Sequence, residues 1–221
     1  MQITHKFRLY PNKETESKLL KNLELHRQTY NTLLAELNNQ KEIDRSQIQG
    51  IIPDMKICDS RFTKLHSKAM QYECYRLFSN LQALKKSKEK RKVGRLRFKG
   101  KGWFKTFTYN QSGFKLIETG KRHQNLWLSK IGNIPIKCHR NIKGKIKQIT
   151  IKKEASGRWY ASIIEERNIT ITKKGIKNVV GIDLGLTNIV YDSDNNKISN
   201  PRHLKKKAEK LAKIQRKLSK K

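Results

Sequence analysis

The first residues of the chain alternate between two kinds of side chain, and the next segments with this pattern lie far along the sequence. From Ile3 to Leu9, every second residue is apolar or histidine, which is the pattern of a strand with one buried face. Short strand-like runs follow much later, separated by turns such as Ser156-Gly157: NLWL, IPIK, IKQITIKK and RWYASIIEE. The sequence therefore predicts a small antiparallel β-barrel or sandwich that a long insertion interrupts.

The insertion begins with the pattern of an amphipathic helix. Asn12 is a plausible N-cap, because Glu14 and Glu16 follow in the first turn, where the helix dipole favours acids. Apolar residues then recur at helical spacing and are expected to be core: Leu19, Leu20, Leu23, Tyr30, Leu33, Leu34 and Leu37. This helix could belong to a helix-turn-helix, but its polar face does not specify a base-reading helix.

The rest of the insertion is predicted to hold one loop and one more helix. Gly50 and Pro53 mark a polar loop. A second helix is expected from about Asp59 to Lys86, with its apolar residues facing inward.

The charge of the chain limits its possible partners. The formal net charge is +33, from 51 Lys and Arg against 18 Asp and Glu. Such an excess repels itself unless a polyanion neutralises it, and nucleic acid is the natural polyanion. No apolar run approaches the roughly 18 residues of a membrane span, and the N-terminus lacks a signal-peptide core. We therefore expect a cytoplasmic, nucleoid-associated protein without a membrane partner.

Positive charge is concentrated in one segment that also carries aromatic residues. Between Lys85 and Lys105 there are eleven Lys and Arg and one acid, Glu89. Lysine and arginine contact phosphates, and aromatic rings stack on bases. Alternation favours a core position for Phe98 and Phe107. The predicted nucleic-acid-binding residues here are Arg95, Arg97, Lys99, Lys101, Trp103, Lys105 and Tyr109.

The cysteines indicate neither a disulfide framework nor a zinc site. Cys58, Cys74 and Cys138 are odd in number, far apart and without a CxxC pair. No histidine pairs with a cysteine or another histidine at ligand spacing. We expect the three to be buried or half-buried free thiols.

The stretch VVGIDLGLTNIVYDSDNNKI places a carboxylate, Asp183, in an otherwise apolar strand between Gly181 and Gly185. Such an acid occurs as a metal ligand in nucleases of the RNase H/RuvC fold. A similar turn cradles ATP phosphates in actin-like ATPases, or the residue could simply cap a turn. An ATPase of that fold begins with this turn and needs hundreds of residues after it, which disfavours that interpretation. Asp192 and Asp194 are interpreted as turn formers.

A last basic helix is predicted after Asn200-Pro201, because proline is favoured in a first helical turn. Its apolar stripe consists of Leu204, Ala208, Leu211, Ile214 and Leu218. Ten Lys and Arg surround this stripe against one acid, Glu209. Lys205, Lys206 and Lys207 are predicted to contact nucleic acid.

Taken in order, these motifs resemble the N-terminal part of the OrfB/TnpB family of insertion-sequence transposases, relatives of the type V CRISPR effector nucleases. The resemblance is carried by four stretches: THKFRLYPNKETESKLL, RLRFKGKGWFKTFTYNQSGFKL, IPIKCHRNIKGKIKQITIKKEASGRWYASIIEE and VVGIDLGLTNIVYDSD. The closing NPRHLKKKAEKLAKIQRKLSKK resembles the family's basic helix after its first catalytic motif.

The resemblance implies an α+β architecture for an RNA-guided DNA endonuclease. A wedge-like β-barrel would comprise residues 1–10 and 93–172, with a helical recognition insertion at 11–92. A linker at 173–178 would lead into an incomplete RuvC-like segment at 179–221.

The resemblance also implies catalytic and binding roles. Asp183 falls on the family's first catalytic aspartate, which holds Mg²⁺. The family's catalytic Glu, second Asp and CxxC zinc ribbon have no counterpart here. The implied partners are a guide-type structured RNA and DNA. We expect a catalytically incomplete protein, and three possibilities stay open: an inactive transposon remnant, a binding-only module and a generic basic RNA-binding protein.

Overall fold

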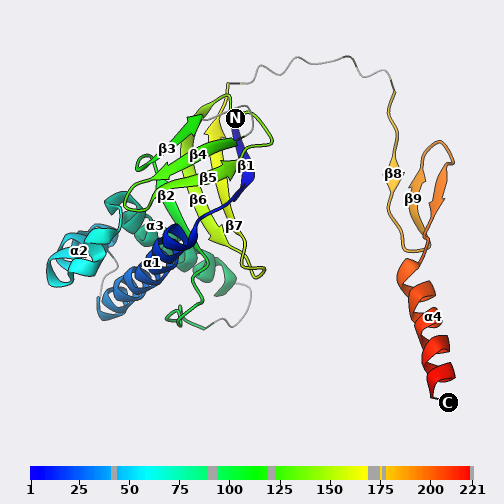
Figure 1. Ribbon diagram of the computed structural model, residues 1–221, viewed down its shortest axis with the longest axis horizontal. Coiled ribbons are helices and arrows are strands. Elements are labelled where there is room, and N and C mark those ends of the chain that lie inside the picture. Colours follow the sequence, from blue (N-terminus) through cyan, green and yellow to red (C-terminus); the bar gives the residue numbers. More distant parts are fainter. Residues whose placement is uncertain (41–43, 89–93, 119–122, 169–174, 176–177, 220–221) are drawn as a thin grey trace. The chain divides into compact units, whose positions relative to one another are not determined.

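The structure is a computed structural model that describes residues 1–40, 44–88, 94–118, 123–168, 175 and 178–219 (Figure 1). Contacts within the chain divide it into two compact units, residues 1–169 and 170–221, and each is described by itself. The predicted linker, residues 173–178, lies mostly outside the described residues.

The first unit is built on one antiparallel sheet of seven strands in the order β2-β6-β7-β1-β5-β4-β3. The strands are β1 (Gln2–Leu9), β2 (Thr106–Asn110), β3 (Phe114–Glu118), β4 (His123–Leu128), β5 (Gly132–Lys137), β6 (Lys145–Lys153) and β7 (Trp159–Glu166). β1 pairs with β7 along its whole length and with β5 at its end. The prediction that the opening strand pairs with distant strands is therefore confirmed.

The sheet curls around its own apolar face. Phe7 of β1, Phe107 of β2, Leu126 of β4, Ile149 of β6 and Ile163 of β7 are fully buried in a single cluster. Phe107 is thus a core residue, as its alternation predicted. Among the described residues no ladder joins the edge strands β2 and β3, so the predicted barrel is an open half-barrel.

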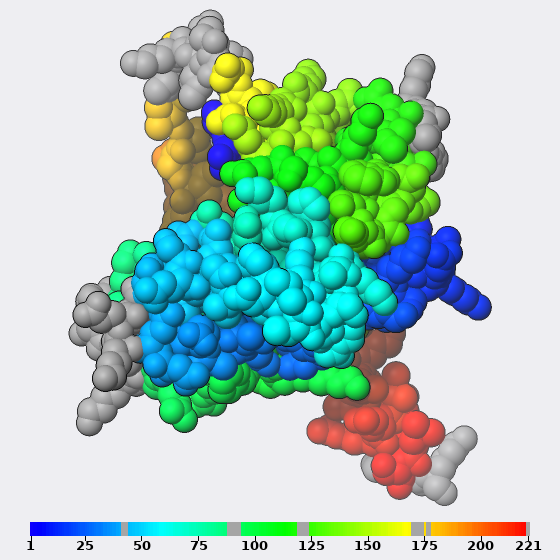
Figure 2. Space-filling model, turned by 90° about the vertical axis from the view of Figure 1, so that its left-hand side faces the viewer, coloured from blue at the N-terminus to red at the C-terminus, as the bar shows by residue number. Residues whose placement is uncertain are grey.

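The insertion is helical, and its first helix begins where the sequence predicted. α1 (Lys13–Asn39) is capped by the Asn12 side chain, which accepts the Thr15 N–H at 2.8 Å. Leu19 and Leu23 of α1 and Ala69 of α3 (Ser67–Lys88) belong to the apolar cluster of the sheet. Figure 2 looks onto the helical insertion, with α1 in blue and the segment that follows it in cyan, and with strands in green above them. Helices and sheet therefore form one compact unit.

The loop predicted around Gly50 and Pro53 is wrong, because α2 (Arg45–Cys58) covers both residues. Ile48, Ile52 and Met55 are buried at helical spacing in a second apolar cluster with α1 and α3. Burial of this stripe outweighs the low helix propensity of glycine and proline. The helix predicted from Asp59 is also divided: a short 3₁₀ turn, η1 (Ser60–Lys64), precedes α3.

A buried carboxylate joins the two ends of the β6–β7 hairpin to β1. The Glu165 carboxylate lies 3.0 Å from Nε2 of His5, within hydrogen-bond distance. It also accepts hydrogen bonds from the main-chain N–H groups of Lys143 and Gly144, at 2.9 and 2.8 Å. Burial alone raises the pKa of Glu165, but the hydrogen bonds from Gly144, His5 and Lys143 and the charge of Arg167 lower it to about 2. This acid stays ionised inside the fold because its donors compensate for lost hydration.

The second unit is a small sheet followed by a helix. β8 (Ile182–Asp183), β9 (Asn188–Asp192) and β10 (Lys197–Ser199) form three antiparallel strands, and α4 (His203–Leu218) follows. The Asp192 carboxylate accepts the N–H groups of Asp194 and Asn196 at 3.0 and 2.8 Å, which confirms Asp192 as a turn former. α4 begins after Pro201 rather than at it, and it has no buried residue.

Among the helices that the structure describes, none has both the length and the apolar character of a membrane span.

Candidate nucleic-acid interface

The part of the basic and aromatic segment that precedes β2, residues 94–105, forms an irregular strap. The start of the segment belongs to α3, and residues 89–93 lie outside the described residues. We call residues 94–105 the basic strap. Arg95, Arg97, Lys101 and Lys105 are exposed and Lys99 is half-buried. None of these five side chains forms an ion pair with a residue that the structure describes. Their charge is therefore available to a ligand.

Two aromatic rings of the basic strap lie on the surface. Trp103 is 74% exposed and Phe98 is 58% exposed. The core position predicted for Phe98 is wrong, because the strap is not a strand and its side chains do not alternate between two faces. Leu96 and Phe104 pack into the helical core instead. Leu96 and Phe104 of the strap thus face the helical core, and Phe98 and Trp103 face the solvent.

Tyr109 belongs to the core and not to the interface. Its ring is 1% exposed, and its hydroxyl donates to the Ser129 carbonyl at 2.7 Å. Burial raises the pKa of this phenol above its ordinary value. The prediction that Tyr109 stacks on a base is therefore wrong, because β2 continues the alternation that also buries Phe107.

A polar and aromatic cleft of about 560 Å³ lies between the start of α2, the outer side of α3 and strands β2 and β6. The guanidinium of Arg45 lies 3.8 Å from the centroid of the Tyr75 ring. The remaining lining residues are Tyr72, Arg76, Phe78, Ser79, Asn80, Gln82, Thr108, Asn110 and Thr150. A stacked guanidinium and neighbouring amides and hydroxyls can bind a base edge or a phosphate.

Arg76 connects the cleft to the basic strap. Its guanidinium donates to the Thr106 carbonyl at 3.2 Å and the Thr106 hydroxyl at 2.9 Å, and it lies 5.0 Å from the centroid of Phe104. A contact with the buried Glu73 carboxylate at 3.2 Å holds it from the other side. Cleft and strap therefore share one rigid connection at the start of β2.

The cleft was not predicted from the sequence, although four of its lining residues have a helical spacing. Tyr72, Tyr75, Ser79 and Gln82 are spaced three or four residues apart and so share one helix face. Arg45 lay beside a segment predicted as a loop, so nothing placed it against α3.

Asp183 lies exposed in β8, beside the β8–β9 turn. Within the described parts of the chain, no three His, Cys, Asp or Glu residues gather as a metal site. The nearby Asp192 carboxylate is occupied by Asn196, whose amide donates at 2.9 Å. The described residues around Asp183 therefore supply one carboxylate and do not fit a complete two-ion Mg²⁺ site.

The other predicted contacts of the second unit lie on α4. Lys205, Lys206 and Lys207 are exposed in its first two turns. Leu204, Leu211, Ile214 and Leu218 are also exposed, between 47 and 86%. The stripe and the lysines predicted on this helix are thus both at its surface.

Comparisons with known proteins match both ends of the chain to one family. Residues 1–43 match the family model HTH_OrfB_IS605, described as "Helix-turn-helix domain", and residues 160–221 match the model OrfB_IS605, described as "Probable transposase". In the structure, residues 2–39 of the first match consist of β1 and the single helix α1.

Curated relatives match more of the chain. A protein of Escherichia coli K12 named "Putative RNA-guided DNA endonuclease InsQ" is 31% identical over 125 residues, 57% of this chain and 30% of that protein. A "Putative RNA-guided DNA endonuclease" of Streptomyces pristinaespiralis is 26% identical over 230 residues, 98% of this chain and 54% of the relative. The chain therefore spans about half the length, or less, of these relatives.

Among solved structures, a CRISPR-Cas12f ternary complex is similar with a TM-score of 0.48 and 13% identity, covering 93% of this chain and 52% of that one. The two family models match in the order in which the landmarks occur in the sequence, and the Streptomyces relative aligns with nearly the whole chain. The chain is a member of the OrfB/TnpB family of insertion-sequence transposases.

Proposed function

We propose that this chain is the nucleic-acid-binding portion of an RNA-guided DNA endonuclease, and that it binds a guide-type structured RNA and DNA. The names of two relatives describe RNA-guided DNA endonucleases, which supports this choice of ligands. The observation that carries the proposal is Trp103, which is 74% exposed in the basic strap, among Lys and Arg side chains that form no ion pair with a described residue.

The basic strap has the two elements that single-stranded nucleic acid requires. Exposed Lys and Arg would neutralise phosphates, and the rings of Phe98 and Trp103 would stack on unpaired bases. The neighbouring cleft adds the stacked pair of Arg45 and Tyr75. We infer that the ligand's backbone follows the strap and that one of its bases or phosphates enters the cleft.

We propose that residues 179–221 correspond to the start of a RuvC-like nuclease domain. Asp183 would be its first metal-binding acid, and Lys205, Lys206 and Lys207 would contact the nucleic acid. The family-model match over residues 160–221 supports this assignment. Mg²⁺, when several carboxylates hold it, stabilises the charge that develops on a phosphate during cleavage. In this chain Asp183 is the candidate ligand, so we assign binding rather than cleavage to the 221 residues themselves.

Inside a bacterium, such a basic protein would associate with the nucleoid through its nucleic-acid ligands.

The decisive experiment is a binding titration over a range of salt concentrations. We expect the purified chain to bind a labelled structured RNA, and six to ten phosphate contacts would weaken affinity by about 10³–10⁵ between 50 and 200 mM salt. A hairpin RNA, a single-stranded RNA and a DNA duplex of equal charge should be compared. Absence of binding at low salt, or an affinity independent of salt, would contradict the proposal.

A further inference from the structure

We propose that Arg27 and Asn31 of α1 are positioning residues for nucleic-acid binding. They bind the main chain of Lys99 and so fix the basic strap in the conformation in which it meets its ligand. We call this contact the Lys99 clamp. The inference rests on the proposed function for its ligand, but the clamp can be tested without any ligand.

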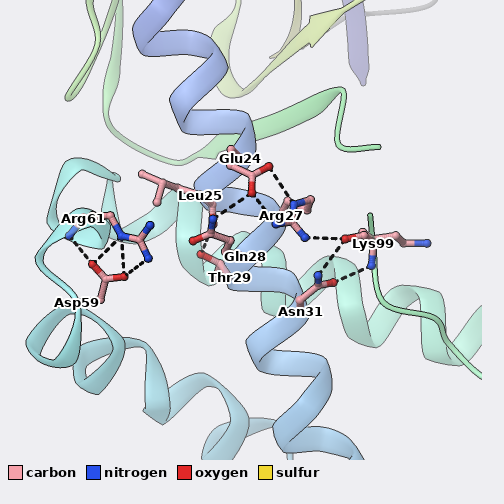
Figure 3. A network of polar contacts seen from close by, with 9 residues as sticks. All are labelled: Glu24, Leu25, Arg27, Gln28, Thr29, Asn31, Asp59, Arg61 and Lys99. Atoms are coloured by element: carbon pink, nitrogen blue, oxygen red, sulfur yellow. Dashed lines mark hydrogen bonds and ion pairs between the residues drawn. The ribbon is translucent and has the colours of Figure 1, made fainter. Parts of the chain in front are cut away.

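The clamp binds both main-chain polar groups of one residue, the N–H and the carbonyl of Lys99 (Figure 3). The Asn31 side chain donates from Nδ2 to the Lys99 carbonyl at 3.0 Å, and its Oδ1 accepts the Lys99 N–H at 2.8 Å. A neighbouring strand would offer the same donor and acceptor to an extended residue. Arg27 Nη1 adds a second donor to the Lys99 carbonyl at 2.7 Å. A single side-chain amide therefore replaces the strand partner that the irregular strap lacks.

Arg27 is itself held in place by a carboxylate. Glu24 accepts from Arg27 Nε at 2.9 Å and from Nη2 at 2.5 Å, and Gln28 Nε2 also donates to it at 3.0 Å. The hydrogen bond from Arg27 lowers the pKa of Glu24, which keeps this acid ionised. Because Glu24 balances the charge of Arg27, the remaining nitrogen, Nη1, donates to the Lys99 carbonyl of the strap and not to a phosphate. This geometry distinguishes Arg27 from the Lys and Arg of the strap, which form no ion pair within the described part of the chain.

The clamp lies between the attachments at the two ends of the basic strap. The side chains of Leu96 and Phe104 pack into the helical core at either end. Between them lie Phe98, Lys101 and Trp103, which are exposed. Since the clamp uses only the main chain of Lys99, it leaves every ligand-facing side chain free. Without it, the exposed stretch is anchored only at its ends and must be ordered when the ligand binds.

The test compares Asn31→Ala with Asn22→Ala, a matched control on the same helix. Asn22 is also an asparagine whose amide donates, but its acceptor is the Lys18 carbonyl within α1. The full chain is first treated with trypsin, and cleavage after Arg97, Lys99 and Lys101 is followed by mass spectrometry. We expect Asn31→Ala to accelerate cleavage in the strap about tenfold or more, because proteolysis reports local opening, while Asn22→Ala does not.

Binding to a labelled single-stranded RNA is then measured at several salt concentrations. We expect Asn31→Ala to weaken affinity by about tenfold, since fixing even one residue's backbone costs this much. The slope of log affinity against log salt should stay unchanged, because no phosphate contact is lost. Arg27→Lys should weaken RNA binding as much as Arg27→Ala does. A single ammonium group cannot replace the planar guanidinium, which binds Glu24 and the Lys99 carbonyl at the same time.

The outcomes separate the clamp from the proposed function. If Asn31→Ala is cleaved no faster in the strap than Asn22→Ala, the clamp is refuted. If cleavage accelerates while RNA affinity stays the same, the positioning role is refuted. If Arg27→Lys retains full affinity, or Arg27→Ala reduces the salt slope by about one, then Arg27 contacts a phosphate and the proposal is wrong. A wild-type protein that binds no nucleic acid instead refutes the proposed function.

Discussion

A Cβ atom on Gly144 would lie 2.2 Å from the carbonyl oxygen of Glu166. No side chain fits into this space, because the obstacle is backbone and not the end of a flexible side chain. The same glycine donates its N–H to the buried Glu165 carboxylate. The turn before β6 therefore depends on Gly144 both for space and for a hydrogen bond.

The first prediction is that Gly144→Ala destabilises the first unit. Overpacking of this kind costs about 1–3 kcal/mol, and a shifted turn would also weaken the bond to Glu165. Chemical denaturation monitored by circular dichroism measures the free energy of unfolding. Gly50→Ala is the control, because nothing lies within 4 Å of the added methyl group and the residue is in α2. That variant should gain about 0.5–1 kcal/mol, and equal losses in both variants would contradict the explanation.

The second prediction concerns stability in acid. Because the pKa of Glu165 is lowered to about 2 from 4.5, the unfolded chain binds more protons at this site between these pH values. The contribution of ionised Glu165 to the free energy of unfolding is complete above about pH 5. It is lost as the pH falls toward 2, and for this pKa shift the loss is roughly 3 kcal/mol. Denaturation of wild type and Glu165→Gln between pH 6 and pH 2 measures it. The variant should lack this part of the pH dependence, and parallel curves for the two proteins would be evidence against it.

The third prediction is that the double variant Trp103→Ala with Lys101→Ala binds RNA more weakly. Lost stacking of one base costs about 1–3 kcal/mol, which is about 5- to 150-fold in affinity, and the lost lysine should reduce the salt slope by about one. Fluorescence anisotropy with a labelled RNA measures both quantities.

The control for this variant is Trp127→Ala with Lys115→Ala. These residues lie opposite each other on β4 and β3 and provide the same two residue types away from the basic strap. An equal loss of affinity in this control would show that the effect is not specific to the strap.

The fourth prediction separates the buried tyrosine from the exposed rings. Tyr109→Phe removes the hydrogen bond to the Ser129 carbonyl and should lower the free energy of unfolding by about 0.5–1.5 kcal/mol. Its affinity for RNA should stay within twofold of wild type. A loss of affinity for RNA without a loss of stability would show that Tyr109 does belong to the nucleic-acid interface.

The fifth prediction is that the purified 221-residue chain does not cut DNA with Mg²⁺ or Mn²⁺ and a matched guide RNA. Cleavage by two metal ions needs ions about 3.5–4 Å apart that several carboxylates hold, and Asp183 is the candidate acid here. Asp183→Ala should leave RNA affinity unchanged. A guide-dependent nick that disappears in Asp183→Ala would show that other acids complete the site.

Local patterns predicted the fold where one chemical signal dominated. The alternation of β1 and the Asn12 cap are both determined by neighbouring residues, and both are confirmed. α2 was missed because Gly50 and Pro53 suggested a loop, whereas the buried stripe of Ile48, Ile52 and Met55 decides the conformation.

The candidate site was predicted in part for a similar reason. Charge and aromatic content identified the basic strap, but period two does not apply to an irregular segment, so Phe98 was wrongly placed in the core. The cleft needs Arg45, Tyr75 and Thr108 to meet. These residues come from three elements, and only tertiary packing brings them together.

The central place of β1 has a consequence for synthesis on the ribosome. His5 and its partner Glu165 are 160 positions apart, and β1 pairs with β7 along its whole length. The first strand to be translated therefore stays without its main neighbour until nearly the whole first unit has left the exit tunnel. Pairing across such a separation makes folding slow. In the meantime α1, α2 and α3 can pack against one another, so the nascent chain has an ordered helical part before its sheet exists.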